Sequence, residues 1–167
     1  MVIVVMGVDG SGKKAVGELL AEAMGCHFYD GDDFHPPENV EKLANNIPLD
    51  DVDHRYWLAT LRNLIEKHIQ KGCQAVVSCS ALTEDYRNQL ANGLNGVEFV
   101  FLNGTYDTIW SRMRRRTNPF IRSDLLKNQI EKIEPLRYGL TVDIQGEPPE
   151  IVNTIVSALN IPASGPM

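Results

Sequence analysis

Residues 7–14, with the sequence G-V-D-G-S-G-K-K, have the residue types and spacing of a loop that binds phosphate. They follow the pattern G-x-x-x-x-G-K-[ST] up to its last position, where Lys14 stands in place of serine or threonine. Glycines let backbone N–H groups close around a phosphate, and the amino terminus of a following helix adds positive charge. Lys13 would pair with the β- and γ-phosphates of a nucleotide. The residues predicted to bind the nucleotide in this loop are Gly7, Asp9, Gly10, Ser11, Gly12, Lys13, Lys14 and Ala15.

An acidic pair, Asp30 and Asp32, stands in the stretch DGDDFHP after the second apolar segment of the chain. Phosphoryl transfer to an alcohol needs a carboxylate that orients the hydroxyl and accepts its proton. Because the two residues are two positions apart, their side chains would point to the same side of an extended chain. One could then face a metal-bound water while the other faces the acceptor. On spacing alone, a solvated acidic turn explains the pair equally well.

A basic run, RMRRR, covers residues 112–116. Arg112 and Arg116 are four residues apart, so they share a face where the run is helical. The run ends a helical stripe and opens a loop at about residues 115–124, the arrangement of a mobile lid that brings arginines onto a transferring phosphate. A solvated basic face and an RNA-binding patch are the alternatives. The net charge of −6 gives no reason to expect nucleic acid as a partner.

Length and composition are typical of a single cytoplasmic domain. A chain of 167 residues can form one domain with a proper core, which we place at residues 1–160, followed by a flexible tail at 161–167. The three cysteines have neither disulfide nor zinc spacing, which favours reduced thiols. The apolar run VIVVM is too short for a signal peptide or a membrane span, so no membrane association is expected.

Strand-like and helix-like segments alternate along the chain. The continuous apolar run at 2–6 is typical of a parallel strand buried on both faces, and further strands are predicted at 26–30, 74–81, 97–104 and 140–144. Helical periodicity predicts helices at about 15–23, 39–45, 57–69, 84–91, 106–113 and 151–159. A further helix is predicted to follow the loop at 116–123 and to end at about residue 133. This alternation predicts an α/β domain with a parallel sheet between helical layers, which binds ligands at the carboxyl ends of its strands. The phosphate loop, the acidic pair and the stretch SCSA all follow strands, so they should converge.

With these motifs, the sequence resembles the gluconate kinases, small P-loop kinases related in fold to shikimate and adenylate kinases. The resemblance runs over about residues 2–160 and rests on MGVDGSGK, FYDGDDFHPPENVEKLANNIPLDDVDHRYWL, CSALTEDYR, SRMRRR and LLKNQIEKIEPL. It implies a P-loop kinase three-layer sandwich with a five-stranded parallel sheet, and ATP with Mg²⁺ as cofactors. It also implies transfer of the γ-phosphate to the 6-hydroxyl of gluconate, and often a homodimer.

The resemblance assigns roles to individual residues. Asp30 would approach Mg²⁺ through its water shell, and Asp32 would position or deprotonate the acceptor hydroxyl. Lys13 and Arg116 would stabilise the transferring charge, and Arg112 would contact the nucleotide. The residues implied to contact the sugar acid, most of them in a covering segment at about 31–53, are Asp32, His35, Asn39, Lys42, Arg55 and Arg87.

The chain also departs from the family's usual residues at the expected site. Lys14 replaces the hydroxyl residue that holds Mg²⁺, and Asn118 and Pro119 replace a Gly-His pair after the lid arginines. His54 stands where an arginine is usual, although Arg55 could substitute from one position along. An ammonium held about 4 Å from Mg²⁺ would be repelled by roughly 8 kcal/mol at an effective dielectric constant of about 20. We therefore expect Lys14 to swing away, and a water to take its place on the metal. Alternatively, Lys14 lies against a phosphate and partly replaces the charge of the metal.

These departures leave three functions open. The first is an ATP-dependent kinase of D-gluconate or a close sugar acid. The second is a catalytically weakened or silent nucleotide-binding protein, because Lys14 cannot bind the metal. The third is a kinase of another small acceptor, such as shikimate or a nucleoside monophosphate. The combination of DGDDFHP with CSALTEDYR favours the first.

Overall fold

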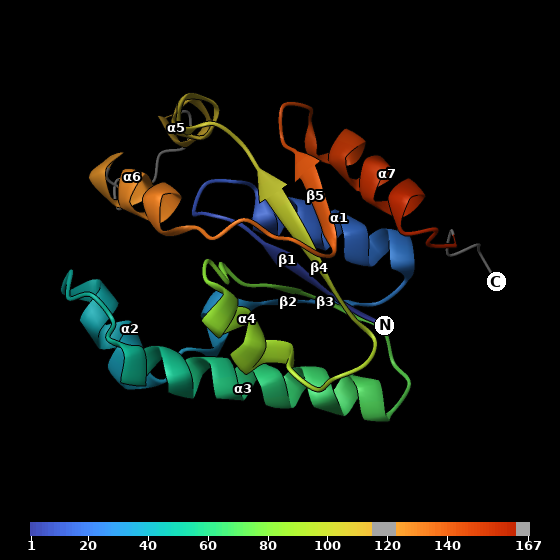
Figure 1. Ribbon diagram of the computed structural model, residues 1–167, viewed down its shortest axis with the longest axis horizontal. Helices are drawn as coiled ribbons and strands as arrows, with labels where there is room; N and C mark the ends of the chain where they lie inside the picture. Colours follow the sequence, from blue (N-terminus) through green and yellow to red (C-terminus); the bar gives the residue numbers. More distant parts are fainter. Residues whose placement is uncertain (115–122, 163–167) are drawn as a thin grey trace.

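Within residues 1–114 and 123–162, which the computed structural model describes, five parallel strands form a central sheet. Their spatial order is β2-β3-β1-β4-β5, and each neighbouring pair is parallel (Figure 1). The strands are β1 (Val2–Met6), β2 (His27–Asp30), β3 (Ala75–Ser78), β4 (Val97–Asn103) and β5 (Leu140–Asp143). The predicted α/β class and the predicted five-stranded parallel sheet are confirmed.

Helices cover both faces of this sheet. α1 (Lys13–Met24) and α7 (Pro148–Ala158) pack together on one face, and α3 (Asp51–Gln70) and α4 (Glu84–Ala91) pack together on the other (Figure 1). This arrangement confirms the predicted three-layer sandwich. In the described part of the chain, no helix combines the length and the apolar character that crossing a membrane requires. The remaining helical elements are η1 (Gly31–Phe34), α2 (Pro37–Ala44), α5 (Tyr106–Arg114) and α6 (Ser123–Lys132).

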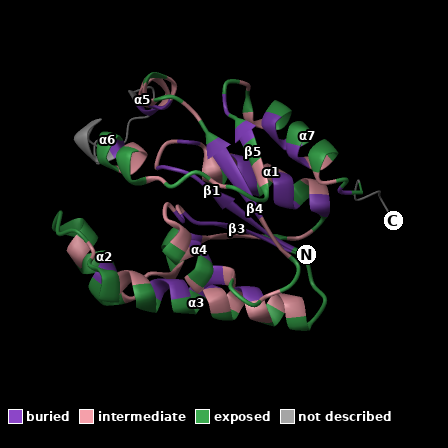
Figure 2. Cartoon of the chain, viewed as in Figure 1, coloured by how far each residue is buried: buried purple, intermediate pink, exposed green. Residues whose placement is uncertain are grey.

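The strand β1 divides the core into two halves. All of its side chains are buried, as the continuous apolar run predicted. Ile3 and Val5 join the half that lies under α1 and α7, whereas Val2, Val4 and Met6 join the half under α3 and α4. Figure 2 shows buried residues along the strands and on the inner faces of the helices. The sheet therefore needs a helical layer on each side.

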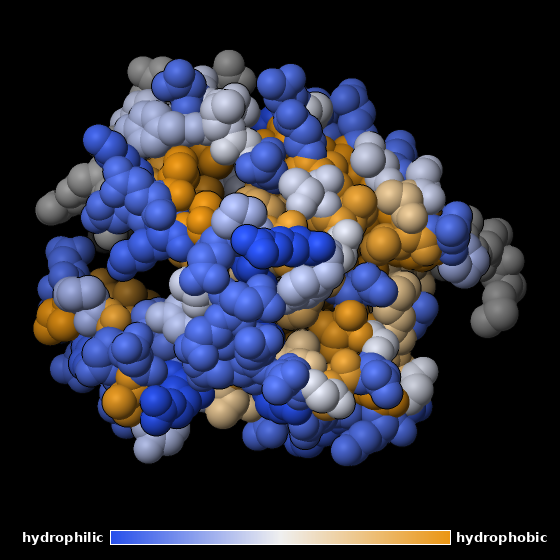
Figure 3. All heavy atoms as spheres, in the orientation of Figure 1, coloured by the Kyte–Doolittle hydropathy of each residue, from blue (hydrophilic) through white to orange (hydrophobic). Residues whose placement is uncertain are grey.

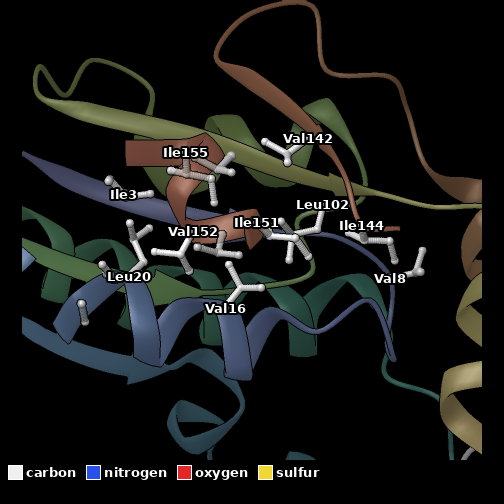
Figure 4. Packing of buried hydrophobic residues seen from close by; sticks show 14 of the residues in the cluster. Ile3, Val8, Val16, Leu20, Leu102, Val142, Ile144, Ile151, Val152 and Ile155 are labelled. Atoms are coloured by element: carbon white, nitrogen blue, oxygen red, sulfur yellow. The ribbon is translucent and has the colours of Figure 1, made fainter. Parts of the chain in front are cut away.

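The core half under α1 and α7 holds the last helix against the sheet. Leu20 of α1 and Ile155 of α7 lie near Ile3 of β1 in Figure 4, and all three are 0% exposed. Burial of one such side chain contributes about 1.5–3 kcal/mol. Ile161 packs into the same core at 7% exposure. The packed domain thus extends to residue 161, one position beyond the predicted boundary.

A capping box fixes the start of α3. Asp50 Oδ1 accepts a hydrogen bond from Asp53 N at 2.8 Å, and Asp53 Oδ2 accepts one from Asp50 N at 3.0 Å. Satisfying the free N–H groups of a helix start in this way is worth about 1 kcal/mol. With the helix start fixed, Trp57, Leu58 and Leu61 fall on the face that packs into the core. His54 lies one turn before this buried face.

Arg87 of α4 is a buried arginine that joins three segments of the backbone. Its side chain is 0% exposed, and Nη1 lies 3.1 Å from Glu84 Oε2. Nε donates to the carbonyl of Ala81, and Nη2 donates to the carbonyls of Leu82 and Glu134. These acceptors occupy most of the guanidinium N–H groups, and a contact between Arg87 and the sugar acid stays a prediction. In this structure, the stretch CSALTEDYR holds α4 to the end of β3 and to the segment before β5.

We predict that Arg87→Leu lowers the free energy of unfolding by about 3–5 kcal/mol, because it leaves three main-chain carbonyls and Glu84 without their buried donor. Urea denaturation of the purified variant measures the loss. Arg62→Leu is the matched control, since Arg62 is 28% exposed and pairs with Glu66 near the surface. The control should lose less than about 1 kcal/mol. Equal losses in the two variants would contradict the structural role of Arg87.

Candidate active site

The loop between β1 and α1 has the backbone geometry of a phosphate cradle. Gly10 and Gly12 have φ angles of 83° and 95°, in the left-handed region where glycine is unstrained. Ser11 Oγ is buried and, among the described residues, is the buried side-chain polar atom without a hydrogen-bond partner. Leaving such a group unpaired costs about 1–3 kcal/mol. A phosphate oxygen bound in the loop would remove this cost, so the loop fits the predicted ligand.

Lys13 lies across the same loop and is held there by oxygen atoms. Its Nζ donates to Gly7 O at 2.8 Å and lies 3.7 Å from Asp9 Oδ1. Asp9 is in turn clamped by Gln129 of α6. Asp9 N donates to Gln129 Oε1, and Gln129 Nε2 donates to Asp9 Oδ2, both at 2.8 Å. Gln129 lies in the stretch LLKNQIEKIEPL, but its type and spacing did not predict a site residue.

Lys14 and Ala15 follow in the first turn of α1. Lys14 is exposed, which agrees with the expectation that its ammonium turns away from a bound metal. Two lysines at the start of a helix oppose the helix dipole, and the first turn of α1 contains no acidic residue to compensate. A bound polyphosphate would supply the missing negative charge.

Asp30 and Asp32 lie at the end of β2, but not in an extended chain. The backbone turns into η1 at Gly31, and Asp30 caps this short helix. Asp30 Oδ1 accepts hydrogen bonds from Asp32 N at 3.0 Å and from Ser78 Oγ at 3.4 Å. The expectation that an extended backbone aligns the two carboxylates was therefore wrong. Instead, Asp30 shapes the turn that presents Asp32.

Asp32 lines a cavity beside the phosphate loop. Its residue surface remains accessible from that cavity, but protein atoms surround the carboxyl on most sides. This desolvation raises the pKa of Asp32 above its ordinary value, and it outweighs the nearby Lys13 ammonium, which lowers the pKa. The negative charge of Asp9 adds to the increase. A carboxylate with a raised pKa is a better proton acceptor than an ordinary aspartate.

The cavity has a volume of about 370 Å³, which is within the usual range for small-molecule sites. Figure 3 shows the surface hollowed on the left, between the regions of α2 and α6. One part of the lining is apolar and comes from α2, α3 and the segment between them, and the rest is acidic, imidazole or neutral polar. The lining residues are Asp9, Asp32, His35, Val40, Leu43, Leu49, His54, Trp57, Ser80 and Gln129.

His35 and Trp57 form one wall of this cavity. Their rings are stacked, with centroids 4.2 Å apart and an interplanar angle of 16°. Trp57 Nε1 donates to Gly31 O at 2.7 Å, so the indole also fixes the turn that carries Asp32. Trp57 was not predicted as a site residue, because its spacing in the sequence is that of a core position. Trp57 is 4% exposed, and it both packs in the core and lines the cavity.

Asn39 and Lys42 contact residues next to the wall that His35 and Trp57 form. Asn39 is 1% exposed, and its Nδ2 lies 3.2 Å from both His35 Nδ1 and Asp53 O. Lys42 Nζ pairs with Asp53 Oδ2 at 2.6 Å. Neither residue lines the cavity, so in this structure both position other groups. Arg55 is exposed on α3 and is likewise not part of the lining.

Arg112 of α5 lies on the far side of the phosphate loop from the acidic pair. Its Nη2 donates to the carbonyls of Ile144 and Gly146, in the connection between β5 and α7. These contacts tie α5 to that connection, and a nucleotide contact by Arg112 stays a prediction. Arg116, Asn118, Pro119 and most of the expected lid at 115–124 lie outside the described residues.

The carboxylates fit Mg²⁺ only as partners of its water shell. Asp30 and Asp32 supply the oxygen atoms that this ion prefers. Within the described part of the chain, no group of three or more His, Cys, Asp or Glu side chains could hold a metal by itself. Mg²⁺ commonly keeps several waters and shares its remaining ligands with substrate phosphates. The donor set agrees with such a site, with Asp30 acting through water.

Comparisons with known proteins agree on one family. A family model described as shikimate kinase matches residues 9–159. A probable gluconokinase from Mus musculus is 36% identical, and the match covers 95% of this chain and 97% of that protein. The thermosensitive gluconokinase of Escherichia coli is 40% identical over 78% of this chain and 70% of its own length. The crystal structure of a gluconokinase from Sinorhizobium meliloti has a TM-score of 0.83 and 42% identity, and the match covers 95% of this chain and 90% of that one. This chain therefore belongs to the gluconokinase family of small P-loop kinases, which is related to the shikimate kinases.

Proposed function

We propose that this protein transfers the γ-phosphate of ATP to the 6-hydroxyl of D-gluconate or a close sugar acid. The observation that carries the proposal is the position of Asp32, which lines the cavity and interacts electrostatically with Lys13 of the phosphate loop. Donor and acceptor sites meet at this one carboxylate, as direct phosphoryl transfer requires. The gluconokinase relatives support a sugar acid as the acceptor.

Different residues would bind ATP and the sugar acid. The N–H groups of the loop and Ser11 Oγ would bind the phosphates of ATP, and Lys13 would leave Gly7 O to pair with the β- and γ-phosphates. Asp32 would orient the acceptor hydroxyl and accept its proton, and His35 would donate a hydrogen bond to the sugar acid. When bound, Mg²⁺ neutralises phosphate charge, and Asp30 would hold it through water.

The alternatives receive less support. A silent nucleotide-binding protein is not favoured, because the relatives are gluconokinases and the acceptor cavity is formed around Asp32. The same relatives favour a sugar acid over shikimate or a nucleoside monophosphate. The kinase family and the fit of the loop support binding of ATP with Mg²⁺. A homodimer and a cytoplasmic location stay predictions.

A coupled ADP-release assay across a panel of sugar acids, with and without Mg²⁺, tests the proposed function. We expect turnover with gluconate at about 1–100 per second, the usual range for kinases. Lys13→Ala is the control, because it removes the cation that pairs with the transferring phosphate. Release of ADP no faster than in Lys13→Ala with every sugar acid would refute the proposal.

Asp32→Asn should lower kcat by at least about a hundredfold and leave the KM for ATP nearly unchanged, because the amide cannot accept a proton. Since the pKa of Asp32 is raised, wild-type kcat should fall on the acid side at a pH above that expected for an ordinary aspartate. Rate measurements against pH check both points. Asp33→Asn, at an exposed neighbour in η1, is the control. If Asp30→Asn is the slower variant and Asp32→Asn is near wild type, the two roles are reversed.

Lys14→Ser should raise turnover and sharpen its dependence on Mg²⁺, because it restores a hydroxyl ligand and removes a cation near the metal. Serine is well tolerated in the first turn of a helix, so folding should not suffer. The measurement is steady-state turnover against Mg²⁺ concentration for both forms. If the variant is slower than the parent at every Mg²⁺ concentration, the ammonium of Lys14 contributes to catalysis and the prediction is wrong.

A further inference from the structure

The cavity proposed for the sugar acid is lined by carboxylates that would repel an anionic substrate. Its described lining contains two carboxylates, Asp9 and Asp32, but no lysine or arginine. A sugar acid would bring a third negative charge into this space, and an unpaired charge in a partly desolvated site is costly. The lining groups that can become cations are the imidazoles of His35 and His54.

Among the described residues, Lys42 and Lys13 lie near this cavity but have other partners. Lys42 pairs with Asp53 at 2.6 Å, a contact that takes up its charge. Lys13 bonds to Gly7 O and is the cation of the phosphate loop. Arg55 is exposed outside the described lining of the cavity. Among the residues that the structure describes, recognition of a carboxylate in this cavity therefore falls to an imidazole.

His35 is fixed in its neutral form. Asn39 Nδ2 lies 3.2 Å from the carbonyl of Asp53, which can only accept, so this atom is the NH₂ group of the amide. The same Nδ2 also lies 3.2 Å from His35 Nδ1, which must then accept and carry no proton. Burial, and after it the neighbouring His54, lowers the pKa of His35. His35 thus offers a neutral Nε2–H group, suited to a hydroxyl.

His54 is arranged in the opposite way. Its Nδ1 lies 3.0 Å from the carbonyl of Asp50, so Nδ1 carries the proton and donates it. The remaining nitrogen, Nε2, gains or loses a proton as the ring changes charge. The ring stacks on Tyr86 of α4, with centroids 5.0 Å apart and an interplanar angle of 22°, so its orientation is held. Protonation of Nε2 would therefore place a new N–H donor and a positive charge on the cavity wall.

The surroundings of His54 include groups of both signs. Three acidic residues, Asp50, Asp51 and Asp53, lie at the start of α3, and Lys42 pairs with Asp53. Tyr86 faces the ring from α4, and its pKa is raised by burial and then by Asp51 and Asp85, so it stays neutral. Trp57 and His35 complete the neighbours on the cavity side.

We propose that the protonated imidazole of His54 binds the carboxylate of the acceptor, so that affinity for the sugar acid is controlled by pH. This inference rests on the proposed function. Imidazoles change charge between about pH 5 and 8, so the cation is present at the acid end of this range and is lost as pH rises. The KM for the sugar acid should then rise up to about tenfold per pH unit on the alkaline side, while kcat changes little there.

Steady-state kinetics from about pH 6 to 9 test this proposal with three proteins. The wild type should show the rise in the KM for gluconate, and the KM for ATP should remain nearly flat. His54→Arg should keep a low gluconate KM at every pH, because its cation is permanent. His54→Gln should have a high gluconate KM that does not depend on pH. A flat KM in the wild type, or the same rise in His54→Gln, would overturn the proposal.

His35→Gln distinguishes the two imidazoles, and it should raise the gluconate KM without removing its pH dependence. Loss of the pH dependence in His35→Gln, with retention in His54→Gln, would also overturn the proposal. Calorimetric titration with gluconate gives a second measurement that does not need turnover. In the wild type above neutral pH, binding should take up close to one proton, seen as a dependence of the heat on the buffer. Binding without proton uptake contradicts this inference alone, whereas binding without turnover of any sugar acid contradicts the proposed function alone.

Discussion

The burial of β1 on both faces is the constraint that places the site. Because residues 2–6 are all buried, the strand lies in the middle of a parallel sheet and helices must cross over on each side. Parallel strands end at the same edge, so the phosphate loop after β1 and the turn η1 after β2 meet there with the chain that follows β3. Gly7 N donates to Ser80 O at 3.3 Å, which joins the first of these segments to the third directly.

Charge divides this edge into two regions. The start of α1, Lys13 and the unpaired Ser11 Oγ form a region that favours an anion, whereas Asp9 and Asp32 make the adjoining cavity acidic. Asp9 lies between the two regions, because it is close to Lys13 and is clamped by Gln129. The clamp connects the loop to α6, so the spacing between the donor and acceptor sites depends on how α6 packs.

The sequence predicted what depends on local pattern. Buried runs gave the strands, periodicity gave the helices, and the glycines with Lys13 identified the phosphate loop. The geometry of the acidic pair could not be predicted, because alternation along an extended chain does not reveal that Gly31 turns the backbone. Trp57 shows a different limit, since one indole packs in the core and also lines the cavity. Contacts between distant segments, such as Asp9 with Gln129, leave no trace in local spacing.

The contacts of Arg87 determine which substitutions around it the fold can accept during evolution. Its acceptors at positions 81, 82 and 134 are main-chain carbonyls, which every residue type supplies. A substitution that leaves the main chain unchanged, as at the exposed position 134, therefore keeps the oxygen atom in place, while position 87 itself tolerates little. Lysine there would keep the charge but lose the planar fork that reaches several acceptors at once. Homologous sequences can thus vary around such an arginine and still retain it, the same pattern that a substrate-binding arginine would leave.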